Sequence, residues 1–486
     1  MDARSIDTQW KLLIDGKRVD AADGALLSVQ NPATEELVAH VALAGEKDLE
    51  RAVKAARAAL GPNSWGGFRA ADRGRVLQRM ASLMRARAEE FAQIESQNAG
   101  KPISAARRQD VPAAIDTLEY YAGWADKIDG SVIATRTDAL TYTVREPVGV
   151  VGAIVPWNFP LMIAVWKVAP ALACGCSVIL KPSELTPLSA HLLGEIALEA
   201  GLPPGTLNIL PGIGREIGTA LVEHPDVDKI SFTGSPGVGK SIMRGAAGNL
   251  KRISLELGGK SANIVFEDAD LDAAVKAAAS AIFFNAGQVC SAGSRILVHE
   301  RVYDEFVDRL ADRARNLRIG DTQDAGTMLG PVISDAQMKK VLGYIAIGCD
   351  EGARLVTGGH RVGDAGYFVE PTVFADVGPS MRIAQEEIFG PVAAVLKFDS
   401  DDEAVEIANG TAFSLAAGLW SRNITRVHTL ARRIHAGTVW VNTYGYTDVR
   451  LPWGGTRDSG FGRELGQAAL ESYTESKTIW VALNGG

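Results

Sequence analysis

Residues 283–294 read FFNAGQVCSAGS and place one cysteine, Cys290, among small residues. An apolar run, AAVKAAASAIFF, leads into this stretch, and a β-like run, RILVHERV, follows it. The pattern predicts that Cys290 lies on a loop between a helix and a strand. Small neighbours leave the backbone open to close approach by a substrate. A free cysteine is more often a small buried hydrophobic residue, so its role depends on the rest of the chain.

The composition indicates an ordinary globular protein. Of the 486 residues, 47% are apolar and 22% are charged, and a chain of this length usually forms two or three domains. The formal net charge of −8 argues against nucleic acid and against anionic membranes as partners. The N-terminal residues, MDARSIDTQWKLLIDG, contain no apolar signal segment, and no apolar stretch is long enough to span a bilayer.

The cysteines and histidines limit which kinds of chemistry the protein can carry out. The four cysteines fit no disulfide framework, which indicates a reducing compartment, and we expect a cytoplasmic protein. We interpret Cys174, Cys176 and Cys349 as structural, because none of them belongs to a redox motif. The seven histidines are scattered singly, so no catalytic metal is expected.

Apolar residues recur at helical spacing in the first part of the chain. Residues 47–60 and 69–98 are predicted to form amphipathic helices on the outside of a domain. The stretch DVPAAIDTLEYYAGWADKIDG predicts a further helix that ends at Gly130. Residues 139–155 predict strands that are broken at Pro147.

Short β-branched runs alternate with helical ones from Val150 to Phe232. This alternation is typical of βαβ units, which form a parallel sheet with helices on both faces. Such a sheet binds ligands beyond the carboxyl ends of its strands. A second α/β region is predicted from about Ser261 to Val441, and the tail ESYTESKTIWVAL predicts a terminal strand.

Two glycine-rich segments suggest nucleotide binding. The segment from Gly212 to Gly218 approximates a dinucleotide fingerprint but has one residue too many, so we interpret it as a tight strand-to-helix turn. The segment from Gly234 to Ser241 matches the P-loop pattern and predicts a nucleoside triphosphatase as one alternative. Only the run ANIVFED could supply the acidic second motif of that class. For any nucleotide, a glycine loop at a helix N-terminus is a favourable pyrophosphate site.

Glu256 is the one carboxylate in the run ISLELGG. A lone carboxylate in an apolar run commonly faces solvent at a strand edge. Its flanking leucines and glycines instead suggest partial burial, which would raise its pKa toward that of a usable general base.

Seven motifs occur in a fixed order along the chain. They are PWNFP (156–160), KPSELTP (181–187), FTGSPGVGK (232–240), LELGGKSANIVF (255–266), FFNAGQVC (283–290), EEIFGPV (386–392) and PWGGTRDSGFGRELG (452–466). With these motifs the chain resembles the NAD(P)-dependent aldehyde dehydrogenase superfamily over nearly its whole length.

The resemblance implies an α/β fold with three parts. A Rossmann-like cofactor domain would comprise residues 1–125 and 149–258, and an α/β catalytic domain would comprise residues 259–458. A small β arm of residues 126–148 and 459–486 would make a homodimer or a homotetramer.

The resemblance also implies how the reaction proceeds. Cys290, as a thiolate, would attack the aldehyde carbon, and Asn158 would donate to the oxyanion together with the Cys290 backbone N–H. Hydride transfer to NAD would leave a thioester, which Glu256 would hydrolyse through a water molecule. Relatives that pass the acyl group to coenzyme A generally lack this glutamate, so a carboxylic acid is the expected product. Lys181 is expected in both the catalytic and the cofactor sets.

The cofactor contacts are expected from four of the motifs. Lys181 and Glu184 match positions that hold the adenine ribose, and a carboxylate there favours NAD over NADP. The alternative is that they form an exposed ion pair of little consequence. The remaining expected contacts are Trp157, Gly234, Ser235, Glu387 and Phe389. Glu387 could instead be solvated, and Asn158 could be only a turn residue.

Several residues match positions at the aldehyde tunnel. Phe159, Trp166 and Trp453 predict an aromatic, largely apolar entrance, and Val289 and Ser291 would shape the pocket floor. Arg450 either binds a substrate carboxylate or pairs with Asp448 or with solvent. A catalytically silent scaffold of the same fold remains a further alternative, although the set of Cys290, Glu256 and Asn158 argues against it.

Overall fold

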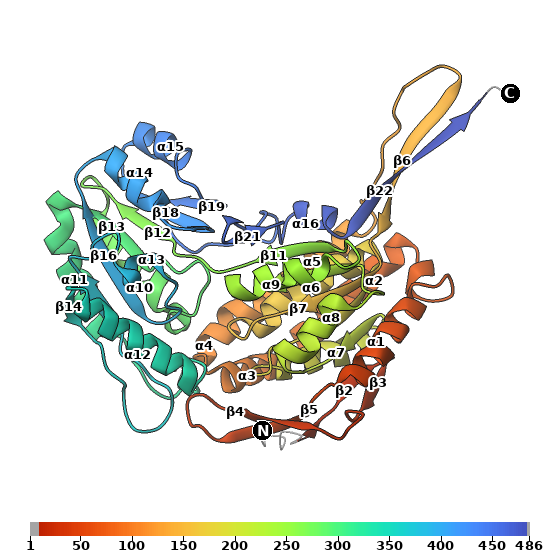
Figure 1. Cartoon of the computed structure of the whole chain (residues 1–486), viewed down its shortest axis with the longest axis horizontal. Coiled ribbons are helices and arrows are strands. Elements are labelled where there is room, and N and C mark those ends of the chain that lie inside the picture. The colour runs from red at the N-terminus through yellow and green to blue at the C-terminus, as the bar shows by residue number, and fades with distance from the viewer. Residues whose placement is uncertain (1–8, 484–486) are drawn as a thin grey trace.

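An eight-stranded sheet organises the first half of the chain in the computed structural model, which describes residues 9–483. Its strands run in the order β21-β11-β10-β7-β8-β9-β2-β3, and the strands from β11 to β9 are parallel. The prediction of βαβ units is therefore confirmed (Figure 1). The strands are β2 (Leu12–Ile14), β3 (Lys17–Val19), β7 (Val150–Ile154), β8 (Ser177–Lys181), β9 (Leu207–Ile209), β10 (Lys229–Thr233), β11 (Arg252–Glu256) and β21 (Gly460–Phe461).

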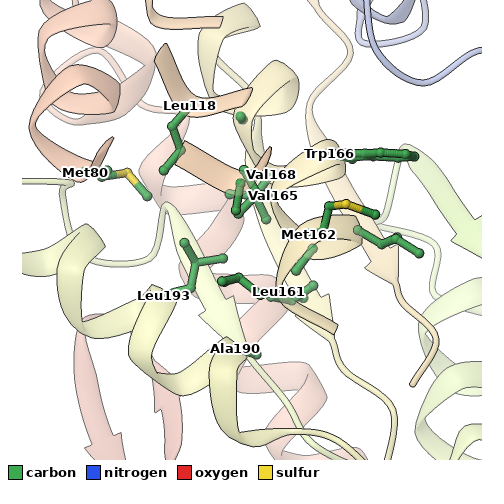
Figure 2. Close-up of a cluster of buried hydrophobic side chains, with 14 of the residues drawn as sticks. Met80, Leu118, Leu161, Met162, Val165, Trp166, Val168, Ala190 and Leu193 are labelled. Carbon is green, nitrogen blue, oxygen red and sulfur yellow. The ribbon is translucent and has the colours of Figure 1, made fainter. Parts of the chain in front are cut away.

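Helices cover both faces of this sheet because successive strand residues point to opposite sides. Val178 of β8 packs in a core with α2, α5, α6 and α7, whereas Ile179 packs in a second core with α1, α8 and α9. Figure 2 shows part of the first core, where side chains of α6 meet Met80, Leu118 and Leu193. The helices are α1 (Glu46–Ala59), α2 (Ala70–Ala86), α3 (Ala88–Ala99), α5 (Val111–Trp124), α6 (Pro160–Cys174), α7 (Leu188–Glu199), α8 (Thr219–Glu223) and α9 (Pro236–Ala246).

The structure corrects two predicted helices. Residues 69–98 form two helices, α2 and α3, because Arg87 leaves the helical conformation with φ −107° and ψ 19°. The helix predicted to end at Gly130 ends at Trp124. Gly130 lies against the strand β6 (Ala139–Pro147), where a Cβ atom would overlap the Thr143 carbonyl oxygen. This glycine therefore permits close packing and does not end a helix.

A seven-stranded sheet forms the second predicted α/β region. Its strand order is β14-β15-β16-β13-β12-β18-β19, and all neighbours except β14 and β15 are parallel. The strands are β12 (Ala262–Val265), β13 (Arg295–His299), β14 (Arg354–Thr357), β15 (Thr372–Ala375), β16 (Val392–Phe398), β18 (Ala416–Trp420) and β19 (Thr438–Val441). Its longer helices are α10 (Leu271–Phe283), α11 (Tyr303–Arg315), α12 (Asp335–Asp350), α14 (Asp401–Asn409) and α15 (Ile424–Ala431).

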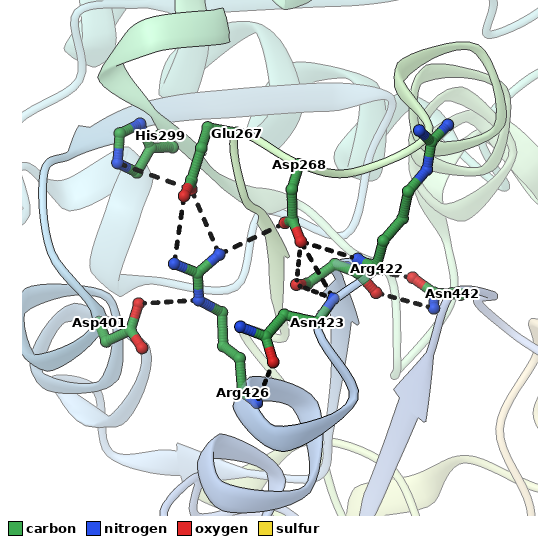
Figure 3. Close-up of polar contacts among 9 residues, drawn as sticks. Glu267, Asp268, His299, Asp401, Arg422, Asn423, Arg426 and Asn442 are labelled. Carbon is green, nitrogen blue, oxygen red and sulfur yellow. Dashed lines mark hydrogen bonds and ion pairs between the residues drawn. The ribbon is translucent and has the colours of Figure 1, made fainter.

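A cluster of charged and polar side chains connects the helices α14 and α15 to the residues that follow β12 (Figure 3). The Arg426 guanidinium pairs with Glu267 at 3.1 Å, with Asp268 at 3.3 Å and with Asp401 at 3.1 Å. Asp268 Oδ2 also accepts a hydrogen bond of 3.0 Å from the backbone N–H of Asn423, which precedes α15. The cluster therefore anchors α14 and α15.

Two long strands form an arm that extends from the body of the molecule (Figure 1). β6 (Ala139–Pro147) pairs antiparallel with β22 (Thr474–Ala482), so the predicted break at Pro147 and the terminal strand are both confirmed. Within residues 9–483, no helix is long and apolar enough to cross a membrane. Residues 1–8, half of the stretch in which no signal segment is predicted, lie outside the described residues, as do residues 484–486.

Shorter elements complete the described chain. A three-stranded sheet near the N-terminus has the order β1-β5-β4. The short elements are β1 (Gln9–Trp10), β4 (Leu26–Gln30), β5 (Leu37–Ala42), η1 (Trp65–Gly67), α4 (Ile103–Ala105), η2 (Ala106–Asp110), η3 (Gly214–Gly218), η4 (Phe284–Gly287), η5 (Glu300–Val302), α13 (Arg382–Gln385), β17 (Phe413–Ser414), β20 (Thr456–Arg457) and α16 (Ala468–Glu471).

Candidate active site

Cys290 lies on the loop between α10 and β13, as its flanking sequence predicts. Asn285 and Ala286 before it have φ angles of 50° and 53°, and Gly287 has φ 71°. Three successive left-handed residues turn the chain sharply, which residues other than glycine adopt only where the surroundings enforce it. This turn leaves Cys290 half-buried.

Hydrogen bonds join the Cys290 loop to the segment that precedes α6. The Asn158 side-chain amide donates to the Gln288 carbonyl at 2.9 Å, and the Asn285 amide donates to the Asn158 carbonyl at 3.1 Å. Gln288 is fixed in turn, because its side-chain oxygen accepts from the Ile333 N–H at 2.8 Å. Asn158 is 4% exposed, and its Oδ1 has no hydrogen-bond partner among residues 9–483. The structure thus brings Asn158 and Cys290 together.

The Cys290 thiol is surrounded by groups that disfavour its ionisation. Burial, followed by the charges of Glu387 and Glu256, raises the pKa of Cys290 to about 12. The thiolate expected from the sequence is therefore a minor form at neutral pH. Attack by this sulfur would require a base that takes up the thiol proton.

Glu256 ends β11 and is buried, as its sequence context suggests. Neither carboxylate oxygen has a hydrogen-bond partner among the described residues. Burial, followed by the charge of Glu464, raises the pKa of Glu256 well above its ordinary value, although Lys167 and Arg463 oppose the shift. Gly454 faces the carboxylate, and a Cβ atom there would overlap Glu256 Oε1. The carboxyl group of Glu256 therefore has a raised pKa, a property that a general base would need.

Lys167 and Glu464 are buried residues that sequence reasoning missed. Their side chains pair at 2.6 Å, and the Lys167 ammonium also donates to the Ser231 hydroxyl at 3.1 Å. Their charges act on Glu256 in opposite directions. The signal was available, because Lys167 interrupts the apolar run LMIAVWKVAPALA.

Two glycines allow Glu387 and Cys290 to approach the end of β11. The Gly259 N–H donates to Glu387 Oε1 at 3.0 Å, and a Cβ atom at Gly258 would overlap the same carboxylate. A Cβ atom at Gly259 would lie 2.5 Å from the Cys290 carbonyl oxygen. Burial raises the pKa of Glu387. Glu387 therefore contacts protein groups beside Cys290 and is not simply solvated.

A pocket of about 580 Å³ opens at the carboxyl ends of β7, β8 and β10 and at the N-terminus of α9. Its lining includes five residues expected to contact the cofactor, namely Trp157, Lys181, Glu184, Gly234 and Ser235. The Lys181 ammonium is 3.1 Å from the Glu184 carboxylate, and their side chains are 3% and 35% exposed, so the lysine end of the pair is buried. Phe389 does not line the pocket itself, but its ring packs edge-on against Trp157, with the ring centroids 5.2 Å apart.

The P-loop residues are used differently from those of a nucleoside triphosphatase. Lys240 does not line the pocket; its ammonium pairs with Asp458 at 2.8 Å on the surface. A Cβ atom at Gly239 would lie 2.7 Å from a Leu257 methyl group, so this glycine lets α9 pack on the sheet. The other glycine-rich segment forms η3, and Gly214 and Gly218 line the pocket. It is therefore part of the cavity wall as well as a turn.

The aromatic residues predicted at the substrate entrance contact other aromatic rings. Phe159 stacks on Phe284 with ring centroids 6.3 Å apart. Trp166 and Trp453 are 6.4 Å apart and are buried. Val289 is partly buried against the same core, and Ser291 is 8% exposed.

Arg450 lies at the edge of this region. Its guanidinium forms two hydrogen bonds to Asp448, of 2.8 Å and 2.6 Å, and its side chain is 74% exposed. Both residues line a pocket of about 360 Å³ that also includes Asp116 and Trp166. The pairing of Arg450 with Asp448, one of the two interpretations, is therefore present in the structure.

Comparison with known proteins places this arrangement in a family. The model of the aldehyde dehydrogenase family matches residues 19–479. This chain belongs to the aldehyde dehydrogenase family. A relative from Bacillus subtilis, named as an aldehyde dehydrogenase, is 49% identical over 97% of this chain and 96% of its own length. Retinal dehydrogenase 2 of Gallus gallus is 46% identical, with 97% and 92% covered.

Solved structures agree with the fold expected from the sequence. The NAD⁺ complex of the aldehyde dehydrogenase from Bacillus cereus has a TM-score of 0.98 and 46% identity and covers 99% of this chain and 98% of its own. The aldehyde dehydrogenase fold is therefore confirmed, and the protein is an aldehyde dehydrogenase. The nucleoside triphosphatase alternative is not supported, since its lysine is turned away from the pocket.

Proposed function

We propose that this aldehyde dehydrogenase uses Cys290 as its nucleophile and oxidises an aldehyde with NAD⁺ and water to a carboxylic acid. The supporting observation is the hydrogen-bonded link between Asn158 and the Cys290 loop beside a buried Glu256. The Asn158 amide gives one N–H to Gln288 and has a second for a substrate oxygen. A nucleophile, an oxyanion donor and a base thus converge from three separate segments.

The first step forms a bond between the Cys290 sulfur and the aldehyde carbon. The carbonyl electron pair moves to the oxygen, where the Asn158 amide and the Cys290 backbone N–H stabilise the charge. The thiol proton passes to Glu256, whose raised pKa makes its ionised form a stronger base. The product of this step is a thiohemiacetal on Cys290.

The second step releases the acid. Bound NAD⁺ supplies the acceptor for the hydride that leaves the former aldehyde carbon, and a thioester remains on Cys290. The proton that Glu256 took from the thiol first passes to solvent, and the ionised Glu256 then takes a proton from water as the water oxygen attacks the thioester carbon. The carbon–sulfur bond then breaks, the Cys290 thiolate leaves and the carboxylic acid is released.

The pocket residues fit NAD⁺ by their chemistry. The Glu184 carboxylate would accept hydrogen bonds from a ribose diol and would repel a 2′-phosphate, so NAD⁺ is favoured over NADP⁺. Lys181 would hold Glu184 in place, and Ser235 and Gly234 at the start of α9 would face the pyrophosphate. The remaining contacts we propose are Trp157, Glu387 and Phe389. The NAD⁺ complex of the Bacillus cereus relative supports this assignment.

The aromatic wall favours an uncharged, largely apolar aldehyde. Phe159, Trp166 and Trp453 would contact the substrate chain, and Val289 and Ser291 would border its reactive end. Arg450 is paired with Asp448, so it offers little to a substrate carboxylate.

The architecture suggests that three parts of the chain have different functions. We assign cofactor binding to residues 1–125 and 149–258, catalysis to residues 259–458 and subunit association to residues 126–148 and 459–486. Exposed apolar residues on the arm, including Val132 and Trp480, support association into a homodimer or homotetramer. We further propose a cytoplasmic location, because all four cysteines are free.

The test is NADH formation by the purified protein with NAD⁺ and short aliphatic, long aliphatic, aromatic and carboxylated aldehydes. We expect turnover that is abolished in Cys290→Ser and unchanged in Cys349→Ser, a control at the exposed cysteine on α12. Equal turnover of Cys290→Ser and the parent protein would refute the nucleophile assignment. A preference for carboxylated aldehydes would refute the substrate assignment.

A further inference from the structure

Three buried charged residues lie behind the segment that carries Asn158 and take no part in the proposed chemistry. Glu95 and Lys101 are 1% exposed and Asp110 is 0% exposed. We name these residues the buried charge cluster. The Lys101 ammonium forms an ion pair with Asp110. Charged residues are almost never fully buried unless they are paired, and a buried pair is often no more stabilising than apolar side chains of the same size.

The local fold brings the cluster together. Glu95 is on the last turns of α3, which Gly100 ends in the left-handed conformation with φ 70°. Lys101 follows at once, and Asp110 is the last residue of the π-helix η2. A π-helix carries one more residue per turn than an α-helix, and such insertions are frequent at functional sites. Here the insertion accompanies an inward-facing, fully buried aspartate.

Two members of the cluster contact the residues that follow Asn158. Glu95 Oε1 accepts a hydrogen bond of 3.2 Å from the Leu161 N–H. This N–H belongs to the first turn of α6 and has no partner within its own helix. The Lys101 ammonium lies 4.0 Å from the centroid of the Phe159 ring. The cluster therefore contacts both the helix that follows Asn158 and the aromatic wall beside it.

The charges suit these contacts. Burial raises the pKa of Glu95 to about 7, and its ionised form interacts favourably with the helix dipole and with the exposed N–H groups. An ammonium over an aromatic face is attracted by the ring, and more strongly where water is excluded. Asp110 neutralises Lys101 and holds it at the Phe159 ring. An apolar side chain could fill the same space but could supply neither contact.

We propose that Glu95, Lys101 and Asp110 are positioning residues that fix Asn158 and Phe159 for the reaction. Glu95 holds the start of α6, and so sets the direction of the Asn158 amide toward the developing oxyanion. Lys101, held by Asp110, sets the Phe159 ring at the substrate wall. This inference rests on the proposed role of Asn158 and adds a second layer of residues that determine its geometry.

The first test separates positioning from folding. Glu95→Met removes the acceptor for Leu161 at similar volume, whereas Glu95→Gln retains an oxygen acceptor. Removal of an oxyanion donor commonly costs ~10²–10³ in kcat, and a misdirected donor should cost a part of this, about tenfold. We expect Glu95→Met to lower kcat about tenfold with little change in aldehyde KM, and Glu95→Gln to restore most of kcat.

The same substitutions in an Asn158→Ala background decide the mechanism. If Glu95 acts through Asn158, Glu95→Met should cost almost nothing further once the amide is absent, because coupled residues are not additive. The same loss in both backgrounds would overturn the inference. An Asn158→Ala variant with unchanged kcat would instead refute the oxyanion role in the proposed function, so the two failures are distinguishable.

The second test addresses Phe159. Lys101→Met combined with Asp110→Leu removes both charges without leaving one buried and unpaired. We expect KM for an aromatic aldehyde to rise several-fold, with KM for acetaldehyde and the dissociation constant of NAD⁺ unchanged. Equal changes for both aldehydes would show that the ion pair does not act through the Phe159 ring.

Discussion

Glu256 is the residue whose environment most clearly departs from that of an ordinary carboxyl group. Its pKa is raised by burial, so the folded protein favours the protonated form, whereas the unfolded chain ionises near the ordinary value. The unfolded state therefore releases its proton first as pH rises, and Glu256 reduces stability progressively above its ordinary pKa. Glu256→Gln removes this effect at nearly constant shape. We predict that its Tm gain over the parent protein grows between about pH 5 and pH 8, which thermal melts at several pH values will measure. A pH-independent difference would contradict the raised pKa.

The protonated resting thiol of Cys290 makes a second prediction at the residue scale. With a pKa of about 12, the thiolate fraction should keep rising with pH throughout the range in which the protein is folded. In the absence of cofactor, alkylation by iodoacetamide should accelerate about tenfold per pH unit from about pH 6 to pH 9. The measurement uses a Cys349→Ser background, because Cys349 is also exposed to the reagent. A plateau near neutral pH would indicate a resting thiolate.

The sequence could predict some residues of the candidate site but not others. Cys290, Asn158 and Glu256 were predicted together, because each lies in a motif with few alternatives, and the structure gathers them. The residues that hold these three side chains in position could not be predicted. Asn285 and Gln288 act through hydrogen bonds that depend on three left-handed residues in a row. Nothing in the identities of Asn285 and Ala286 requires that conformation, since neither is glycine.

The loop after β11 offers a prediction at the scale of an element. Gly259 packs against the Cys290 carbonyl, so Gly259→Ala must move the backbone that holds the proposed nucleophile. We predict a loss of stability of about 1–3 kcal/mol together with loss of most NADH formation. Gly343 on α12 is the matched control, because a Cβ atom there meets no other atom within 4 Å. Gly343→Ala should gain up to about 1 kcal/mol from helix propensity and retain activity. Chemical denaturation and steady-state assays will test both variants. Full activity in Gly259→Ala would exclude the close approach.

Elements were predicted well where apolar residues repeat and poorly where backbone geometry decides. The parallel strands from β7 to β10 were evident, because residues buried on both faces give continuous β-branched runs. A glycine spacing that fits a phosphate loop also fits a helix packed closely on a sheet, and only the direction of Lys240 separates the two.

At the scale of the whole molecule, the two sheets meet around the Cys290 loop. Glu256 ends the first sheet, whereas Cys290 precedes β13 of the second. Asn158 comes from the first sheet region and bonds to the Cys290 loop. The site therefore depends on how the two regions are held together. Sequence motifs indicate which residues belong to the candidate active site, but they do not show how the two sheets are placed relative to each other.

The arm offers the last prediction, which concerns assembly. β6 and β22 pair over residues 139–147 and 474–482 and project from the body (Figure 1). An isolated two-stranded ribbon is marginally stable in water, yet this one exposes Trp480 by 57%, and Val132, which bridges to Tyr142 of β6, is 76% exposed. A ribbon of this kind needs a partner surface, and we propose another copy of the chain. We predict that Trp480→Lys lowers the molar mass measured by light scattering after size exclusion, because a buried charge opposes association. Leu250→Lys is the control, since Leu250 is 89% exposed outside the arm and should leave the mass unchanged. An unchanged mass for Trp480→Lys would place the subunit interface elsewhere.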